Sequence, residues 1–138
     1  MTPKQLIAEA KEAQKMSYSP YSHFEVGAAL LTKSGKIYYG CNIENAAYTP
    51  CNCAERTAFF KAVSEGEKEF TSIAIVGNKN GTQPEKGEFC TPCGVCRQVM
   101  AEFCNPKEFM IFVTDGYTIK EYRLDELLPQ SFGPGNLQ

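Results

Sequence analysis

The chain has 138 residues, of which 43% are apolar and 22% are charged, and its formal net charge is −2. This composition is ordinary for a soluble globular protein and the length suits one domain with a full core, so we expect a single domain over residues 1–138. Proteins that bind nucleic acids usually carry a basic excess, because neutralising phosphates supplies much of their affinity. The slightly acidic balance therefore predicts a small-molecule substrate and no nucleic-acid partner.

The chain also lacks the patterns of membrane and secreted proteins. Its longest apolar run covers residues 26–31 and contains Gly27, far short of the roughly 20 residues that a membrane-spanning helix needs. Residues 1–4 lead into an amphipathic helical pattern and not into the apolar centre of a signal peptide. We therefore expect a cytoplasmic protein without a membrane partner. Seven cysteines, an odd number, argue against a disulfide framework and favour a metal site or catalysis.

The N-terminal segment predicts a helix over residues 2–16, because Thr2 is a suitable N-cap and Pro3 a suitable first helical residue. The other expected elements, in chain order, are strands over 24–32 and 37–42 that form a hairpin, a helix that starts near residue 53, a strand over 70–76, a long loop over 77–90, a helix that starts after residue 92, strands over 109–114 and 117–122, and a short helical piece in the tail. This order predicts an α/β domain with a mixed sheet of about five strands.

Two short stretches carry the candidate chemistry. They read Cys-Ala-Glu-Arg over residues 53–56 and Pro-Cys-Gly-Val-Cys over residues 92–96. Both are expected at helix N-termini, where the helix dipole and free N–H groups stabilise thiolates. A catalytic zinc ion keeps three protein ligands and leaves its fourth position to water. Cys53, Cys93 and Cys96 would supply those three ligands, so the expected cofactor is Zn²⁺.

Glu55 and Arg56 are the candidates for the remaining chemistry. Zinc can lower the pKa of a bound water from roughly 15.7 to about 7, and Glu55, two residues after Cys53, could then act as general acid and base. Three thiolates on one Zn²⁺ leave an excess negative charge, which Arg56 could offset by donating hydrogen bonds to the sulfurs. The alternatives are a first-turn glutamate favoured by the helix dipole and an ordinary surface cation.

Three other interpretations of the cysteines remain open at this point. Adding Cys51 to the three candidate ligands would give a closed four-cysteine structural zinc site. The Cys-x-x-Cys-x-x-Cys run over residues 90–96 is similar to the start of an iron–sulfur motif, although Met100 stands where its fourth cysteine would be. The pair over residues 93–96 alone could be a redox pair. None of these interpretations explains Glu55.

Several motifs together resemble the cytidine deaminases, specifically the small homotetrameric kind. The motifs that carry the resemblance cover residues 21–30, 40–45, 53–58, 92–98 and 127–134. The resemblance implies a three-layer α/β/α sandwich and an enzyme that hydrolyses cytidine and deoxycytidine to uridine and deoxyuridine with release of ammonia. It also implies a role in pyrimidine salvage and a homotetramer whose subunits share their active sites.

The same resemblance assigns roles to further residues. Asn42 and Glu44 match residues that hold the ribose 3′-hydroxyl, and Phe24 matches an aromatic residue near the base. Tyr48 and Phe132 match residues that a neighbouring subunit contributes to the site. By itself, an aromatic residue at a strand start is usually part of the core, and a polar pair such as Asn42 and Glu44 can simply shape a loop.

The resemblance leaves other functions to be weighed. A blasticidin-S-type deaminase or a deaminase for a modified cytosine nucleoside would use the same zinc chemistry. The Asn-x-Glu loop over residues 42–44 and the Ser-Phe-Gly-Pro tail over residues 131–134 favour cytidine. A polynucleotide deaminase is disfavoured by the acidic balance and by the missing His-x-Glu motif. From another class, the chain could be a non-catalytic domain with a structural zinc ion.

Overall fold

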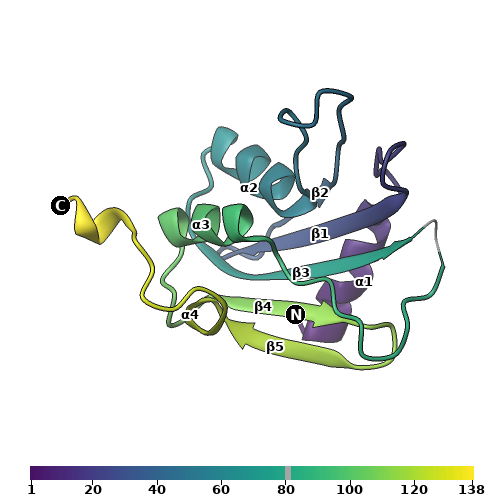
Figure 1. Cartoon of the computed structure of the whole chain (residues 1–138). Coiled ribbons are helices and arrows are strands. Elements are labelled where there is room, and N and C mark those ends of the chain that lie inside the picture. The colour runs from purple at the N-terminus through teal and green to yellow at the C-terminus, as the bar shows by residue number, and fades with distance from the viewer. Residues whose placement is uncertain (80–81) are drawn as a thin grey trace.

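The computed structural model describes residues 1–79 and 82–138, and a mixed five-stranded sheet forms its centre (Figure 1). The strands are β1 (Phe24–Thr32), β2 (Ile37–Cys41), β3 (Phe70–Lys79), β4 (Met110–Thr114) and β5 (Ile119–Arg123), in the spatial order β2-β1-β3-β4-β5. Neighbouring strands are antiparallel except β3 and β4, which are parallel. The predicted mixed sheet is therefore confirmed.

Helices cover both faces of this sheet. They are α1 (Pro3–Gln14) on one face, α2 (Ala54–Ser64) and α3 (Gly94–Phe103) on the other, and the short α4 (Leu124–Leu127) beside α3. Side chains alternate along β1, because successive strand residues point to opposite faces. Ala28 and Leu30 join the core under α2 and α3, whereas Ala29 joins the core under α1. The implied three-layer α/β/α sandwich is confirmed.

The first helix begins as the sequence predicts. The Thr2 side chain accepts a hydrogen bond from the Gln5 amide, and the Gln5 side chain accepts one from the Thr2 amide, so the two form a capping box. The helix ends at Gln14, two residues before the predicted end. There the Gln14 side chain donates to the Glu25 carbonyl oxygen at 2.9 Å, which ties the end of α1 to β1.

The predicted end of the third strand was wrong. We expected a loop from Gly77 onward, but β3 continues to Lys79, because the antiparallel pairing with residues 24–26 of β1 extends that far. Gly77 is a strand residue whose missing side chain leaves room for the Cys90 sulfur and the Phe24 ring. It reflects a close approach of other groups, and it does not mark a turn.

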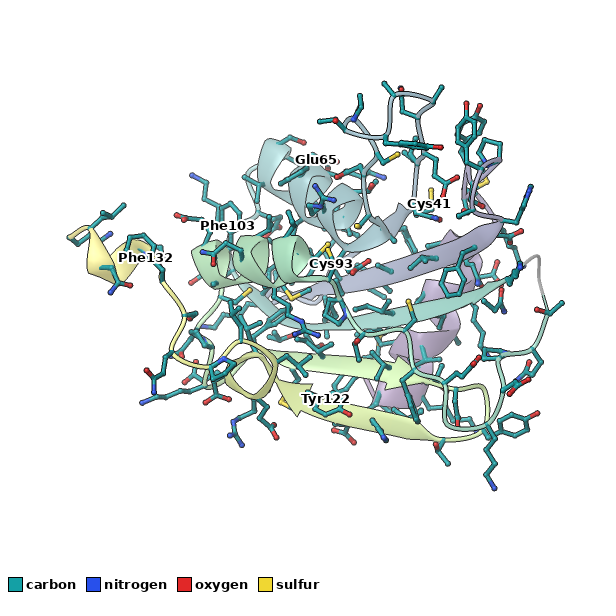
Figure 2. All side chains as sticks on the ribbon, viewed as in Figure 1. Cys41, Glu65, Cys93, Phe103, Tyr122 and Phe132 are labelled. Carbon is teal, nitrogen blue, oxygen red and sulfur yellow. The ribbon has the colours of Figure 1, made fainter. Side chains whose placement is uncertain are left out.

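The C-terminal tail leaves the body of the domain after α4 and carries a short 3₁₀ helix, Pro134–Asn136 (Figure 1). Phe132 lies on this tail (Figure 2), and its carbonyl oxygen accepts a hydrogen bond from Gln98 of α3 at 2.8 Å. Within the two described parts of the chain, no helix combines the length and apolar character needed to cross a membrane.

Candidate zinc centre and active site

Two helix starts bring three cysteine sulfurs together. Cys53 and Cys93 occupy the N-cap positions of α2 and α3, and Cys96 is buried in the first turn of α3. The Cys53 and Cys93 sulfurs are 3.8 Å apart, and those of Cys93 and Cys96 are 3.5 Å apart. All three sulfurs lie within 4.8 Å of one another. Figure 2 labels Cys93 at the start of α3.

The sulfur spacing fits a zinc ion. With Zn–S bonds of about 2.3 Å and tetrahedral angles, sulfur ligands lie about 3.8 Å apart, close to the separations in this cluster. Over residues 1–79 and 82–138, the metal-binding group contains three side chains and no fourth histidine, cysteine or carboxylate ligand. Three ligands with an open fourth position are the arrangement of a catalytic zinc site, whereas structural sites have four.

Arg56 lies against this cluster. Its Nη2 donates to the Cys53 sulfur at 3.3 Å, and its buried Nε has no hydrogen-bond partner among the described residues. A hydrogen bond from the Cys96 thiol, together with the Arg56 guanidinium, lowers the pKa of Cys53 to about 5. The same hydrogen bond raises the pKa of Cys96. Arg56 thus places a permanent positive charge beside the Cys53 sulfur.

Glu55 is the buried carboxyl group of the site. It lies in the first turn of α2, is only 5% exposed, and is not a member of the sulfur cluster. Burial raises the pKa of its carboxyl group to about 7. A group with this pKa can both accept and release a proton near neutral pH, which is the property that general acid–base catalysis requires.

A cavity of about 270 Å³ adjoins the sulfurs and brings the sugar-binding candidates to them. Its lining includes Asn42, Glu44, Cys53, Glu55 and Cys93. These residues come from the segment after β2 and from the starts of α2 and α3, so segments far apart in sequence meet here. The volume is slightly below that of typical ligand pockets, which are roughly 300–1,000 Å³.

Asn42 is held by the backbone of β1. Its side-chain oxygen accepts from the Val26 amide at 2.9 Å, and its side-chain nitrogen donates to the Phe24 carbonyl oxygen at 2.8 Å. The oxygen also accepts from the Ser17 hydroxyl. An asparagine amide has two N–H donors, so one donor remains beyond these contacts.

Glu44 is fixed by the turn that precedes β1. Its Oε1 accepts from the Tyr21 amide at 3.0 Å and from the Ser22 amide at 3.1 Å, and its Oε2 accepts from the Ser22 hydroxyl. The Ser22 hydroxyl and these amides lower the pKa of the Glu44 carboxyl group. A carboxylate can accept about four hydrogen bonds, so one acceptor position remains.

The three aromatic candidates lie outside this cavity. Phe24 lines a neighbouring cavity, which shares Cys90 with the first. Tyr48 is 72% exposed on the loop after β2, where its ring meets the edge of the Tyr21 ring at 6.4 Å between centroids. Phe132 is 58% exposed on the tail. None of the three lines the sulfur cavity of its own chain.

Cys51 does not complete a four-cysteine site. Its sulfur accepts from the Asn45 amide at 3.1 Å and belongs to the loop, not to the sulfur cluster. Cys90 is also outside the cluster, although both cysteines line the cavity. Sequence reasoning missed Cys90 as a cavity residue. Its sequence signal was its place three residues before Cys93, in the run that is similar to an iron–sulfur motif.

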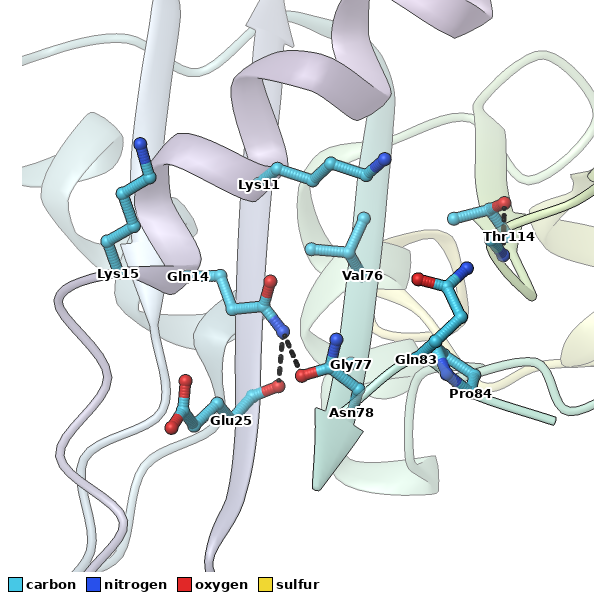
Figure 3. A pocket seen from close by; sticks show the side chains of 11 residues that line it. Lys11, Gln14, Lys15, Glu25, Val76, Gly77, Asn78, Gln83, Pro84 and Thr114 are labelled. Atoms are coloured by element: carbon cyan, nitrogen blue, oxygen red, sulfur yellow. Dashed lines mark hydrogen bonds between the residues drawn. The ribbon is translucent and has the colours of Figure 1, made fainter. Parts of the chain in front are cut away.

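A larger hollow of about 370 Å³ lies elsewhere on the domain (Figure 3). Lys11 and Gln14 of α1, Val76 of β3, and Gln83 after β3 are among its lining residues. It shares no lining residue with the sulfur cavity. Neither the candidate metal ligands nor Glu55 line this larger hollow.

Comparison with known proteins agrees with this geometry. A family model described as the cytidine and deoxycytidylate deaminase zinc-binding region matches residues 1–113. The chain is 48% identical to a cytidine deaminase from Sporosarcina psychrophila over 99% of this chain and 96% of that protein. It is 31% identical to a blasticidin-S deaminase from Bacillus cereus over 93% of this chain and 90% of that protein.

Among solved structures, the crystal structure of cytidine deaminase from Burkholderia pseudomallei matches with a TM-score of 0.84 at 45% identity, covering 96% of this chain and 100% of that chain. The resemblance that the sequence motifs indicated is confirmed over nearly the whole length. The chain belongs to the zinc-dependent cytidine and deoxycytidylate deaminase family.

Proposed function

We propose that this chain hydrolyses cytidine and deoxycytidine to uridine and deoxyuridine with release of ammonia, as a step of pyrimidine salvage. One observation carries the proposal: a single cavity is lined by Cys53 and Cys93 of the three-sulfur cluster, by the buried Glu55 carboxyl group, and by the Asn42 and Glu44 side chains. Such a cavity combines a metal site, an acid–base group and polar groups that can orient a small ligand.

Glu55 moves the protons in this reaction. Cys53, Cys93 and Cys96 would hold the zinc ion, which would act as a Lewis acid and make water nucleophilic near neutral pH. The Glu55 carboxylate accepts a proton from the attacking water as the C4–O bond forms. The resulting carboxylic acid donates this proton to ring nitrogen N3. The regenerated carboxylate then accepts the second proton, from the new C4 hydroxyl, and passes it to the departing amine, so that the C4 carbonyl forms as the C4–N bond breaks and ammonia leaves. The pKa of about 7 suits both steps.

Arg56 adjusts the charge of the metal site. Three thiolates and one Zn²⁺ sum to −1, which weakens the ion as a Lewis acid. The hydrogen bond from Arg56 to the Cys53 sulfur at 3.3 Å withdraws charge from a ligand. The buried Nε of Arg56 is a second donor that a thiolate can accept from.

Asn42 and Glu44 bind the ribose 3′-hydroxyl. A hydroxyl group both donates and accepts hydrogen bonds. Asn42 retains one N–H donor and Glu44 one acceptor position after their contacts within the chain are counted. The pair therefore matches one hydroxyl, and the 3′-hydroxyl is common to cytidine and deoxycytidine.

The charges around the cavity support a nucleoside substrate over a nucleotide. Arg56 is the one cationic side chain among the described residues that line the sulfur cavity, and it is engaged by Cys53. The neighbouring cavity has Lys79 but also Glu85 and Glu88. A 5′-phosphate needs uncommitted cations or a free helix N-terminus. The N-cap positions of α2 and α3 at this cavity are occupied by the metal-ligand candidates Cys53 and Cys93.

We further propose a cytoplasmic homotetramer with shared sites. Tyr48 and Phe132 are large, exposed aromatic side chains outside their own cavity. Exposed aromatic groups of this kind are typical of protein interfaces. A neighbouring subunit's aromatic side chain would cover a cavity that is small in a single chain. The seven unpaired cysteines are suited to a reducing compartment.

A substrate panel tests the proposal. Ammonia release would be measured with the zinc-loaded protein on cytidine, deoxycytidine, deoxycytidylate and blasticidin S. We expect turnover of both nucleosides and little of the other two compounds. Turnover confined to blasticidin S would support the alternative suggested by the 31%-identical relative, and bound zinc without any turnover would support a non-catalytic domain.

A further inference from the structure

One arginine joins the zinc-ligand loop to the C-terminal tail. Arg97 follows Cys96 in α3; its Nε donates to the Pro92 carbonyl oxygen at 2.7 Å and its Nη1 to the Leu127 carbonyl oxygen at 2.8 Å. Pro92 is buried and directly precedes the ligand Cys93, whereas Leu127 is the last residue of α4. A single guanidinium thus connects two segments that are far apart in sequence.

Both acceptors depend on this side chain. No backbone amide of the described residues donates to the carbonyl oxygen of Pro92 or of Leu127 outside the regular elements. A buried carbonyl group that loses its partner destabilises the fold. Arginine suits the position, because its planar fork holds two donors at a fixed angle, which a lysine ammonium group cannot do.

The next residue continues the same connection. The Gln98 side chain donates to the Phe132 carbonyl oxygen at 2.8 Å. Consecutive residues of α3 therefore hold the root of the tail and a point further along it. Leu127 also packs against the core under α2 and α3, so the root of the tail is part of the folded domain.

We propose that Arg97 is a positioning residue that couples zinc retention to the seating of the C-terminal tail. By fixing the Pro92 carbonyl group, Arg97 holds the backbone that places the Cys93 sulfur. By holding the Leu127 carbonyl group as well, Arg97 links the direction of the tail to the position of the backbone that carries Cys93. The inference rests on the proposed zinc enzyme, in which Phe132 of that tail serves a neighbouring subunit.

Zinc release from the full-length, zinc-loaded protein tests this coupling. Transfer of zinc to a chromogenic chelator would be timed for Arg97→Lys, Arg97→Gln and the unaltered protein, below the onset of thermal unfolding. We expect zinc to leave both variants about tenfold faster or more, the usual effect of removing a group that orients a ligand. Arg97→Lys keeps the positive charge but loses the planar fork that contacts both carbonyl groups. This variant therefore distinguishes the effect of the contact from the effect of the charge.

A matched control accompanies this test. Arg123→Lys changes an arginine that pairs with Asp125 in a surface ion pair. This control should release zinc at the rate of the unaltered protein. Unchanged release from both Arg97 variants would overturn the proposal. The proposal would also be overturned if Arg97→Gln released zinc faster while Arg97→Lys released it at the rate of the unaltered protein. The positive charge, and not the contact with two carbonyl groups, would then be what retains zinc.

A second measurement needs no variant. Coupling between two sites is reciprocal, so zinc binding should slow amide hydrogen exchange over residues 127–133 of the unaltered protein. Exchange there that is the same with and without zinc would overturn the coupling even if the Arg97 variants fail to fold. Both readouts are independent of turnover. Failure to deaminate cytidine would refute the proposed function and leave the zinc-release result to decide the role of Arg97.

Discussion

Single residues of the site carry both a structural and a chemical task, and Glu44 is the clearest case. Its carboxylate receives three hydrogen bonds from Tyr21 and Ser22, which hold the turn before β1. The same carboxylate lines the sulfur cavity. Its pKa is lowered by the Ser22 hydroxyl and the backbone amides, so it remains an ionised acceptor in the working range of pH.

Glu44→Gln should therefore raise KM more than it lowers kcat. Loss of a hydrogen bond to a charged group costs about 1.5–3 kcal/mol, so kcat/KM should fall at least about tenfold. Steady-state kinetics should show the same loss on cytidine and deoxycytidine, and little further loss on 3′-deoxycytidine. Glu25→Gln, in the cavity of Figure 3, is the control. A loss confined to cytidine would instead assign Glu44 to the 2′-hydroxyl.

At the scale of elements, close packing of α2 on β2 fixes where the zinc ligands begin. A side chain on Gly40 of β2 would collide with the backbone of Ala54 and Ala58 in α2. The bare glycine lets the first turn of α2, with Glu55, lie directly on the sheet. The position of the catalytic carboxyl group thus depends on an absent side chain.

Gly40→Ala should destabilise the protein. Forcing extra volume into a packed contact costs typically about 1–3 kcal/mol, and here the colliding atoms are backbone, so we expect about 2 kcal/mol or more. Urea denaturation of the zinc-loaded protein measures this change. Gly94→Ala is the matched control, because a side chain there meets nothing within 4 Å. Equal stability of the two variants would contradict the packing argument.

Asp115 joins the β4–β5 turn to the loop after β3. Its Oδ1 accepts from the amides of Tyr117 and Thr118, and its Oδ2 accepts from the Gly87 amide at 2.7 Å. These hydrogen bonds, that of Thr118 foremost, hold the pKa of Asp115 well below its usual range. The unfolded chain takes up this proton near pH 3.9, so the stabilisation is complete above about pH 4 and is lost as the pH falls below it.

Asp115→Asn should lower the urea midpoint at neutral pH, because an amide nitrogen would face the Gly87 amide. The difference from the unaltered protein should shrink as the pH falls below about 4. Metal-free protein is used throughout, since acid also releases zinc from thiolates. Asp125→Asn, which removes a surface ion pair with Arg123, should change little. A pH-independent difference for Asp115→Asn would contradict the linkage.

Much of the fold was predictable from local pattern, and the misses have a physical cause. Helical and strand periodicity located the elements that carry Cys53 and Cys93, because these segments bury one regular face. Gly77 was wrongly assigned to a loop, because the sequence alone does not distinguish a glycine that allows other groups to approach closely from a glycine that forms a turn. Cys90 and the contacts of Arg97 depend on distant chain segments, which no local pattern encodes.

At the scale of the whole molecule, the proposed tetramer makes a direct prediction about mixed chains. Glu55→Gln and Phe132→Ala chains should each be nearly inactive alone. Unfolding and refolding them together should restore activity, because a site can combine Glu55 of one chain with Phe132 of another. Random assembly restores roughly a quarter of the sites. Mixtures no more active than their components would show that the sites are not shared.

The most direct test of the central claim compares the unaltered protein with Glu55→Gln. Bound zinc and ammonia release from cytidine would be measured in the same samples. We expect about one zinc ion per chain in both proteins, and turnover in the variant lower by a factor of about 10²–10⁴. Full turnover by the variant, or zinc-loaded unaltered protein that releases no ammonia, would contradict the account.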